Sequence, residues 1–306
     1  MDRTRFSKIL IKKAKKIKYA LMGSKYQFIA KFFYDFVINI ELNLLFFIDS
    51  IKSTAPSEHS ELLNELTIVI KTFERYKALD RLLRSLKKYY PSVKIIVVDD
   101  SLHPKEISSV EKINMPYNSG ISAGRNAALS QVITKYTLFL DDDFIFFKKT
   151  KVEDSLKLID SDQRIDILGG EVIDLPLFKI HDYSKIGLYP TDSQPVAPIG
   201  SKISGLPVYD KVPNFFICRT DRVRKVGWDN NLKKIEHADF FTRARGILLT
   251  VYNENFSCLH APTPFDGKYM KFRNDCAVEK LILMRKYFHE NSTNNEKQHN
   301  NREVSK

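Results

Sequence analysis

The feature that most constrains this chain is an apolar run, Tyr136-Thr-Leu-Phe-Leu140, that leads directly into Asp141, Asp142 and Asp143. A short apolar run rich in aromatic residues is typical of a buried β-strand. Three carboxylates at the end of such a strand repel one another, and burying them is costly unless a cation compensates. A divalent metal ion does so and leaves positions for phosphate oxygens. The run therefore predicts a metal and phosphate site, and the alternative is an exposed acidic turn.

The rest of the chain alternates between strand patterns and helical patterns. Residues 66–72 and 93–100 are strand-like, and between them leucines recur at helical spacing. This alternation predicts an α/β fold with a Rossmann-like, mostly parallel sheet flanked by helices on both faces. The proline-rich residues 176–211 are expected to form an irregular lid or binding loop. Further strands are expected at 165–173, 212–220 and 248–260, and helices at 236–245 and 277–288.

Polar side chains gather where the first strands of the expected sheet end. Thr72, Glu74 and Arg75 follow the first strand, and Asp99 and Asp100 end the second. Because ligands of such sheets bind at the carboxyl ends of the strands, these residues and the three aspartates predict one shared site. Asp99 and Asp100 are suited to accept hydrogen bonds from a uracil or a ribose, and the alternative is that they cap a turn.

Two glycine-containing stretches indicate close approaches of the backbone. In Ser119-Gly-Ile-Ser-Ala-Gly-Arg-Asn126, Gly124 leaves room for a nucleotide, and Arg125 supplies a fork for a diphosphate or a base carbonyl. This stretch matches neither the Walker loop nor the dinucleotide fingerprint. Gly170, in the pair Gly169-Gly170, indicates either a bend or a close approach to a ligand.

Candidates for metal binding, proton transfer and acceptor binding lie in the second half of the chain. His260 ends the last expected strand, where its imidazole could complete the shell of a manganese ion; the alternative is an ordinary hydrogen-bonded histidine. Glu236, His237 and Asp239 crowd one helix start, where an acid could deprotonate a sugar hydroxyl or could stabilise the helix N-terminus. Trp228, the only tryptophan, is either a platform for an acceptor sugar or a core residue.

The positive charge of the chain is concentrated at its N-terminus. The net charge is +12, and residues 1–31 hold ten Lys or Arg and one acidic residue, a net +9. This distribution favours an enzyme with a basic arm over a nucleic-acid-binding body. Residues 8–18 mix apolar and basic side chains like a helix on an anionic membrane surface, or else form a solvated helix packed on the domain. No segment approaches the roughly 18 to 20 apolar residues of a membrane-spanning helix.

We therefore expect three parts. Residues 1–60 form a basic, helical appendage with a linker, residues 61–290 one catalytic domain, and residues 291–306 a disordered tail. Three cysteines without a metal or disulfide pattern favour a reducing compartment. The expected location is cytoplasmic, at the inner face of the membrane if the basic arm binds lipid.

Five segments follow one another along the chain: Thr67-Ile-Val-Ile-Lys-Thr-Phe-Glu-Arg75, Val98-Asp-Asp-Ser101, Ser119-Gly-Ile-Ser-Ala-Gly-Arg-Asn126, Lys135-Tyr-Thr-Leu-Phe-Leu-Asp-Asp-Asp-Phe144, and Asn214-Phe-Phe with Glu236-His-Ala-Asp-Phe-Phe241. In this order they resemble the glycosyltransferase family 2-like enzymes of GT-A fold, most nearly the β-1,4-N-acetylgalactosaminyltransferases, over about residues 65–262. The resemblance implies a UDP-sugar donor, a Mn²⁺ or Mg²⁺ ion and inversion at the anomeric carbon. It also implies transfer of N-acetylgalactosamine, or another hexosamine or hexose, to a glycan or lipid-linked glycan.

The resemblance also implies roles on the donor side of the site. Asp141 and Asp143 are similar to the two metal-proximal acids of the D-x-D motif, and Asp142 would lie near the ribose or the donor sugar. Asp99 or Asp100 would hold the uridine, with Arg125 close by.

On the acceptor side the chain departs from the pattern of the family, in which the second acid of a Glu-Asp pair is usually the base. Here the second position is His237, so the base stays open among Glu236, Asp239 and His237. The chain also lacks the anchor and stem of the animal enzymes and the Gln-x-x-Arg-Trp motif of processive synthases. These departures favour a bacterial-type enzyme that adds single sugars.

Two other classes of protein are alternatives to a glycosyltransferase. A sugar-phosphate nucleotidyltransferase needs a glycine-rich loop after the first strand, and Thr72-Phe-Glu-Arg-Tyr-Lys77 contains no glycine. A non-catalytic membrane or nucleic-acid binder would be built around the basic arm. Deletion of residues 1–50 is expected to separate this binder from a transferase.

Overall fold

The structure is a computed structural model that describes residue 16 and residues 20–51, 61–108 and 110–289. Its centre is a mixed β-sheet with the strand order β3-β2-β1-β4-β10-β6-β11-β5, and β7 pairs with β6. β1 (Leu66–Thr72) is parallel to both β2 (Lys94–Asp99) and β4 (Tyr136–Asp141). The carboxyl ends of these three strands therefore meet at one edge of the sheet, as the sequence predicts.

The other strands complete the sheet on both sides of this parallel core. β10 (Phe216–Arg219) is antiparallel to β4 and to β6 (Ile167–Asp174), whereas β6 and β11 (Thr250–His260) are parallel. The remaining strands of the described residues are β3 (Glu111–Asn114), β5 (Phe144–Ile145), β7 (Lys179–Ile180) and the separate hairpin of β8 (Lys202–Ile203) and β9 (Leu206–Pro207). The predicted mixed, mostly parallel α/β fold is confirmed.

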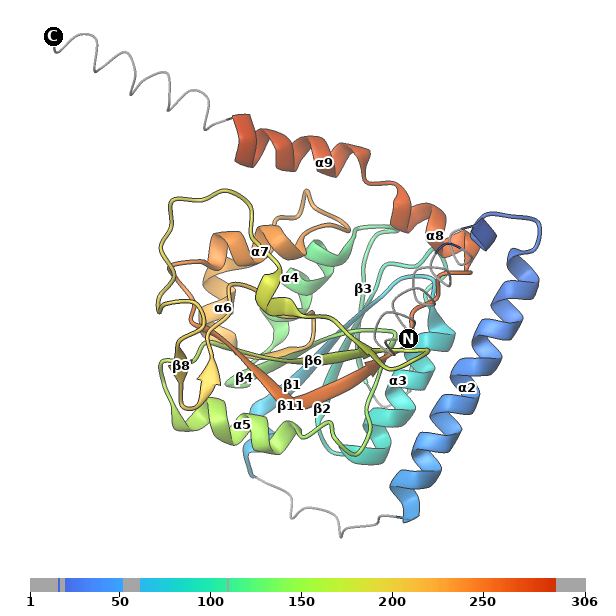
Figure 1. Cartoon of the computed structure of the whole chain (residues 1–306), viewed down its shortest axis with the longest axis horizontal. Helices are drawn as coiled ribbons and strands as arrows, with labels where there is room; N and C mark the ends of the chain where they lie inside the picture. Colours follow the sequence, from blue (N-terminus) through green and yellow to red (C-terminus); the bar gives the residue numbers. More distant parts are fainter. Residues whose placement is uncertain (1–15, 17–19, 52–60, 109, 290–306) are drawn as a thin grey trace, which may run out of the picture.

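Helices cover both faces of the sheet, as Figure 1 shows. On one face α3 (Tyr76–Tyr89) buries Leu79, Leu82 and Leu86 in one apolar cluster with the strands; this face explains its helical spacing of leucines. On the other face α4 (Ile121–Gln131) buries Ala128 and Leu129 in a second cluster. Because both faces are covered, every residue of β1 is buried, which accounts for its continuous apolar pattern.

The further helices are short. They are α5 (Val152–Ser161), α6 (Thr220–Val226), α7 (His237–Ala244), α8 (Gly267–Asn274) and α9 (Ala277–Met284), with 3₁₀ turns η1 (Glu61–Glu65) and η2 (Tyr183–Lys185) and a π-helical turn η3 (Arg285–His289). Three of these helices, α5, α6 and α8, were not predicted from the sequence. The sequence predicted α7 with one extra residue at each end, and the structure divides the expected helix 277–288 into α9 and the π-helical turn.

Part of the N-terminal appendage is a long helix, α2 (Gln27–Ile51), that packs against the domain. Its Ile38 and Leu42 lie in a buried cluster with Ile145 of β5 and Leu259 of β11. The tail at 291–306 lies outside the described residues, as do all of the expected basic helix at 8–18 except residue 16 and most of the linker at 49–61. None of the helices in the described ranges is both long enough and apolar enough to cross a membrane.

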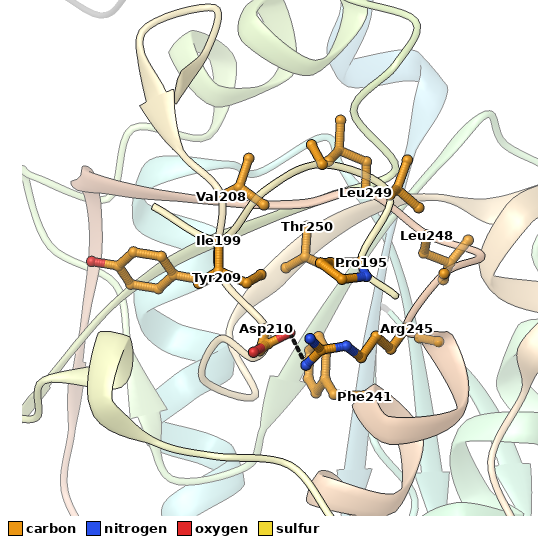
Figure 2. A pocket seen from close by; sticks show the side chains of 14 residues that line it. Pro195, Ile199, Val208, Tyr209, Asp210, Phe241, Arg245, Leu248, Leu249 and Thr250 are labelled. Carbon is orange, nitrogen blue, oxygen red and sulfur yellow. Dashed lines mark hydrogen bonds and ion pairs between the residues drawn. The ribbon is translucent and has the colours of Figure 1, made fainter. Parts of the chain in front are cut away.

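The expected irregular segment 176–211 is largely irregular and contains only β7, η2 and the β8–β9 hairpin. Its end is fixed to the C-terminus of α7 by an ion pair of 2.7 Å between Arg245 and Asp210 (Figure 2). The hollow beside this pair has a volume of about 20 Å³. Ligand sites are roughly ten or more times larger, so this hollow is no candidate for a sugar site.

Candidate active site

A cleft of about 680 Å³ lies at the carboxyl ends of β1, β2 and β4. The strand register places Thr72 beside Asp99 and Lys71 beside Asp141, so the polar strand ends form one floor. The walls come from the start of α4, the end of β11 and helix α8. Among the predicted site residues, those that line the cleft are Arg75, Asp100, Asp141, Asp142, Asp143, Glu236, His237 and His260.

Arg75 neutralises two of the three aspartates. Its Nη1 donates to Asp143 Oδ2 at 2.6 Å, and its Nη2 bonds to Asp142. Thr72 Oγ1 donates to Asp142 Oδ2 at 2.8 Å, and Tyr269 of α8 stacks on the guanidinium with 4.2 Å between the ring centroid and Cζ. Burial raises the pKa of Asp142 although Arg75 opposes this. At Asp143 burial also opposes ionisation, but Arg75 and then His260 outweigh it, so the pKa lies well below its usual range.

The third aspartate is joined to the candidate base by Arg125, which is almost fully buried. Arg125 Nη2 donates to Asp141 Oδ1 at 3.1 Å, and Nη1 donates to Glu236 Oε1 at 2.9 Å. Asn214 Nδ2 donates to Asp141 Oδ2 at 3.3 Å. The sequence analysis put Arg125 near the uridine. The structure instead buries it between two acids, because α4 packs beneath the floor of the cleft.

His260 is held in place by a second carboxylate. Its Nδ1 lies 2.7 Å from Asp174 Oδ1, and its Nε2 lies 3.3 Å from Asp143 Oδ2. Asp174 also contacts His181 Nε2 at 2.8 Å. Burial lowers the pKa of His260, but Asp143 and Asp174 outweigh this effect and raise it to about 10. Asp174 was not predicted as a site residue. It is an acid at the end of an expected strand, like the predicted site residues, and this position could have identified it.

Oxygen and nitrogen atoms of the kinds that bind divalent metal ions line this part of the cleft. Asp141 and Asp143 offer carboxylate oxygens and His260 an imidazole, a set that suits Mn²⁺. Asn214 adds a buried Oδ1 that has no hydrogen-bond partner. Within the described residues, however, no group of three or more His, Cys, Asp or Glu side chains stands ready to hold a metal. Arg75 and Arg125 occupy the carboxylates in this arrangement.

Asp100, the residue that follows β2, faces the cleft. It bonds to Lys71 Nζ and accepts a hydrogen bond from Gly120 N at 2.8 Å. A Cβ on Gly124 would lie 2.6 Å from Lys71 Cδ, so this glycine makes room for the lysine rather than for a nucleotide. Burial lowers the pKa of Lys71. The sequence analysis missed Lys71, although a lysine inside an otherwise apolar strand is costly to bury without a partner and was a usable signal.

Asp99 and Glu74 hold loops together outside the cleft. Asp99 accepts hydrogen bonds from Tyr76 Oη at 2.7 Å and from Ser101 N at 3.0 Å, which is the turn-capping alternative. Glu74 accepts a hydrogen bond from Leu102 N at 2.8 Å. Neither side chain lines the cleft, so the donor-binding roles expected for them lack a geometric basis.

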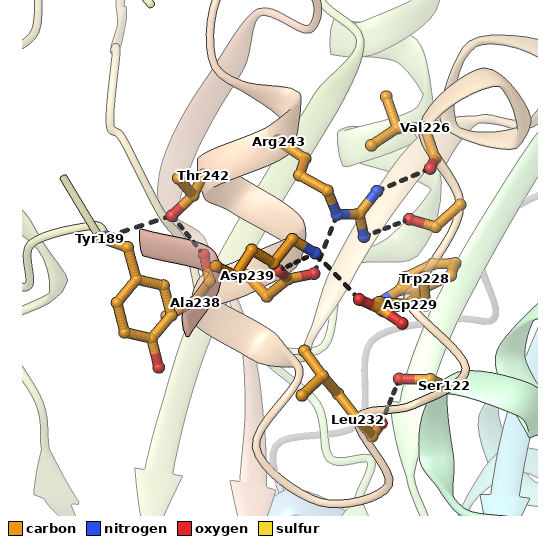
Figure 3. Close-up of polar contacts among 12 residues, drawn as sticks. Ser122, Tyr189, Val226, Trp228, Asp229, Leu232, Ala238, Asp239, Thr242 and Arg243 are labelled. Carbon is orange, nitrogen blue, oxygen red and sulfur yellow. Dashed lines mark hydrogen bonds and ion pairs between the residues drawn. The ribbon is translucent and has the colours of Figure 1, made fainter. Parts of the chain in front are cut away.

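Asp239 and Trp228 also lie away from the cleft. Asp239 is fully buried, and it accepts a hydrogen bond from Arg243 Nε at 2.9 Å (Figure 3). It also accepts a hydrogen bond from Tyr287 Oη at 2.6 Å and pairs with Lys286. Trp228 stacks on Phe240 at a centroid distance of 4.6 Å. A carboxylate with three partners is not available as a base, and a buried indole cannot stack on a sugar. Both residues stabilise the fold around α7.

Gly170 serves the packing of the sheet. A Cβ at this position would lie 2.4 Å from Phe256 O and 2.5 Å from the ring of Phe215. The glycine pair therefore marks a close approach between β6 and its neighbours and not a contact with a donor.

Two candidates for the base remain in the cleft. Burial raises the pKa of Glu236, and Arg125 only partly opposes this. Burial, with smaller contributions from Lys211 and Arg125, lowers the pKa of His237 to about 3, and its Nε2 has no hydrogen-bond partner. A base works best when its pKa approaches the working pH, so the directions of these two pKa shifts favour Glu236.

The mixed sheet, with a cleft of buried carboxylates at the ends of its parallel strands, agrees with the GT-A class of glycosyltransferase folds. A family model described as "Glycosyl transferase family 2" matches residues 67–227, more than half of the chain. The chain therefore belongs to glycosyl transferase family 2, and a glycosyltransferase takes the place of the nucleotidyltransferase and non-catalytic alternatives.

Curated relatives are similar over the same region. Beta-1,4 N-acetylgalactosaminyltransferase 1 of Rattus norvegicus is 39% identical over 201 residues, which cover 60% of this chain and 36% of the relative. Beta-1,4 N-acetylgalactosaminyltransferase 2 of Mus musculus is 37% identical over 198 residues, which cover 63% of this chain and 39% of the relative. The chain thus spans little more than a third of the length of these relatives.

Solved structures agree in fold. S. aureus TarS 1-349 aligns with a TM-score of 0.50 and 18% identity, covering 64% of this chain and 60% of that chain. The same protein in complex with UDP-GlcNAc gives a TM-score of 0.50 and 19% identity, with coverages of 64% and 58%. At these identities the likeness supports the fold alone.

Proposed function

We propose that this chain transfers a hexosamine, with N-acetylgalactosamine as the first choice, from a UDP-sugar to a hydroxyl group of a glycan or glycolipid. The observation that carries the proposal is the cleft itself, in which Asp141, Asp142 and Asp143 face a buried carboxylate, Glu236. The choice of sugar rests on the similarity to the β-1,4-N-acetylgalactosaminyltransferases.

On the donor side, Asp141, Asp143 and His260 would hold a Mn²⁺ or Mg²⁺ ion. When bound, such an ion neutralises the charge that develops on the departing diphosphate. Asp174 keeps the imidazole of His260 oriented toward Asp143. Arg75 lies in the same cleft and adds a cation for phosphate oxygens.

The nucleoside is proposed to lie against Asp100. The pair of Asp100 and Lys71, together with Gly120 N, offers an acceptor and a cation at the end of β2. These groups are buried and already hydrogen-bonded, so they are oriented before the donor arrives. Such preorganisation lowers the cost of binding.

On the acceptor side, Glu236 is proposed as the general base. It takes the proton of the acceptor hydroxyl while the oxygen attacks the anomeric carbon, and the bond to the diphosphate breaks on the opposite face. This displacement inverts the anomeric configuration. Arg125 fixes the carboxylate through one oxygen, Oε1, and links it to Asp141 on the donor side.

We propose a cytoplasmic location for the enzyme. Cys218 and Cys258 are buried and free, and Cys276 is free as well. Thiols persist in this state in a reducing compartment.

The test is a panel of UDP-sugars assayed for UDP release by the full chain, with Mn²⁺, with Mg²⁺ and with a chelator. UDP-N-acetylgalactosamine is expected to be hydrolysed or transferred fastest, and the chelator is expected to stop release. The proposal fails if no UDP-sugar releases UDP under any of these conditions. Equal rates with metal and with chelator would remove the metal from the mechanism.

A further inference from the structure

Helix α2 lies along the outside of the domain (Figure 1), and many of its large apolar side chains are exposed. Phe32, Phe33 and Phe47 are 63%, 60% and 62% exposed. The outer face, as we call this surface, consists mainly of Phe32, Phe33, Phe36, Leu44 and Phe47. An exposed apolar surface of this length is unusual for a soluble monomer and marks an interaction site.

The charged side chains of α2 lie on its other half. Glu41 Oε1 accepts a hydrogen bond from Leu177 N at 3.1 Å, and Asp49 Oδ2 accepts one from Lys148 N at 3.1 Å. Lys31 and Asp35 pair with each other at 3.2 Å. By helical periodicity all four fall on the half that buries Ile38 and Leu42. These charged residues interrupt the apolar run in the sequence, but in the helix they leave the outer face without charge. Asn39 and Asn43 are polar side chains at this face.

A turn beside α2 carries two more exposed apolar side chains. Leu177, bonded to Glu41 of α2, is 71% exposed, and the next residue, Phe178, is also exposed. Both have left-handed backbone angles, with φ of 79° and 49°. Bulky residues adopt left-handed backbone angles at a cost in free energy. The turn therefore has an unfavourable backbone conformation, and it also leaves two apolar side chains in solvent beside α2.

The chain that leads into α2 is strongly basic. Residues 1–25 contain nine Lys or Arg and one acidic residue. Apolar aromatic surface and adjoining positive charge together match the chemistry of an anionic bilayer surface, where apolar burial and attraction to lipid headgroups add. A second copy of the chain would carry the same positive charge, which disfavours self-association at this face.

We infer that the outer face of α2, with Leu177 and Phe178, lies in the interfacial layer of an anionic membrane. The start of α2 touches the rim of the cleft, because Gln27 Nε2 donates to Phe265 O at 2.8 Å and Met22 lines the cleft. A bound membrane surface would thus run beside the entrance. In this respect the inference rests on the proposed function, and it specifies a lipid-linked acceptor.

Vesicle flotation of the full chain tests the inference. Vesicles of phosphatidylcholine alone are compared with vesicles that also contain phosphatidylglycerol. The test variant combines Phe32→Gln, Phe36→Gln and Phe47→Gln, which change only exposed side chains. A matched control combines Ile133→Gln, Val196→Gln and Ile247→Gln, which change exposed apolar side chains elsewhere.

The wild type and the control variant are expected to float with the anionic vesicles. The test variant is expected to bind these vesicles at least about tenfold more weakly. UDP release in solution should be the same for all three. The inference is overturned if the test variant binds anionic vesicles as strongly as the wild type does, or if the wild type does not bind them. It is also overturned if the outer face instead supports a dimer in sizing chromatography that the test variant loses. Vesicle binding without any UDP release would contradict the transferase proposal alone.

Discussion

Two buried arginines divide the acids of the cleft between them. Arg75 pairs with Asp142 and Asp143, and Arg125 pairs with Asp141 and Glu236. Removing one partner of a buried ion pair leaves a charge without compensation, which is costly. Substitutions of the arginines therefore disturb the fold as well as the chemistry. Conservative changes of the acids test the proposed roles more cleanly.

Glu236→Gln keeps the shape of the side chain and removes its basicity. It is expected to lower kcat by about 10²- to 10⁴-fold, the usual contribution of a general base. UDP affinity, measured by calorimetry, should change little. Asp239→Asn serves as a control for charge loss at α7 and should lower thermal stability more than kcat. If His237→Asn alone abolished turnover while Glu236→Gln kept it, the base would be His237.

A graded loss of metal affinity is expected at the His260 side of the cleft. Asp143→Asn removes a proposed ligand and should abolish Mn²⁺ binding and UDP release. Asp174→Asn removes only the group that orients His260, and a loss of about 10- to 100-fold in Mn²⁺ affinity is expected. Calorimetry with Mn²⁺ in the presence of UDP measures both. Near-normal turnover of Asp143→Asn with metal present would exclude the metal-site assignment.

At the scale of elements, close contacts between neighbouring segments build the cleft. α4 lies near enough to β1 that Gly124 faces the side chain of Lys71. β6 lies near enough to its neighbours that Gly170 faces backbone and a ring. The two glycines look alike in the sequence, but one contact is with a flexible side chain and the other with rigid groups.

These two contacts predict opposite effects of alanine. In Gly124→Ala the end of Lys71 can move aside, so the melting temperature should change little while UDP affinity falls as the Lys71–Asp100 pair is disturbed. Gly170→Ala meets Phe256 O and should lower the free energy of unfolding by about 1 to 3 kcal/mol. Its UDP affinity should be normal below the melting temperature. Equal UDP affinity in Gly124→Ala and the wild type would argue against Lys71 and Asp100 as the nucleoside site.

At the scale of the whole molecule, α2 is fastened to the edge of the sheet formed by β5 and β11. Ile38 and Leu42 contribute to the cluster that covers Ile145 and Leu259. Tyr34 Oη donates to Leu175 O at 3.2 Å and adds a polar contact. The helix is thus part of the folded body through one of its faces, and its outer face is exposed.

Substitution of two leucines distinguishes the packed face of α2 from its outer face. Leu42→Ala removes a buried side chain and is expected to cost about 2 to 5 kcal/mol of stability. Leu44→Ala changes an exposed leucine of the outer face and should leave the melting temperature nearly unchanged. Thermal denaturation of the full chain measures both. Equal melting temperatures for the two variants would show that α2 does not pack on the domain in solution.

The sequence by itself determined the parallel core and the floor of the cleft. Periodicity identified β1, β2, β4 and α3, because strands covered on both faces are continuously apolar and a one-sided helix repeats its leucines. The order of the motifs also identified the family. The acids at the ends of the parallel strands lie close together because the strand register brings these ends to the same edge of the sheet.

The tertiary structure alone decided what each polar residue contacts. Trp228, Asp239, Gly170 and Asp99 looked functional along the chain, yet packing and hydrogen bonds turn them away from the cleft. Lys71 and Asp174 gain their positions only when β1 meets α4 and β6 meets β11. In α2, folding separates an interrupted apolar run into a packed face and an uncharged outer face. The physical reason is that periodicity is local, whereas the partner of a buried charge is set by segments far apart in the chain.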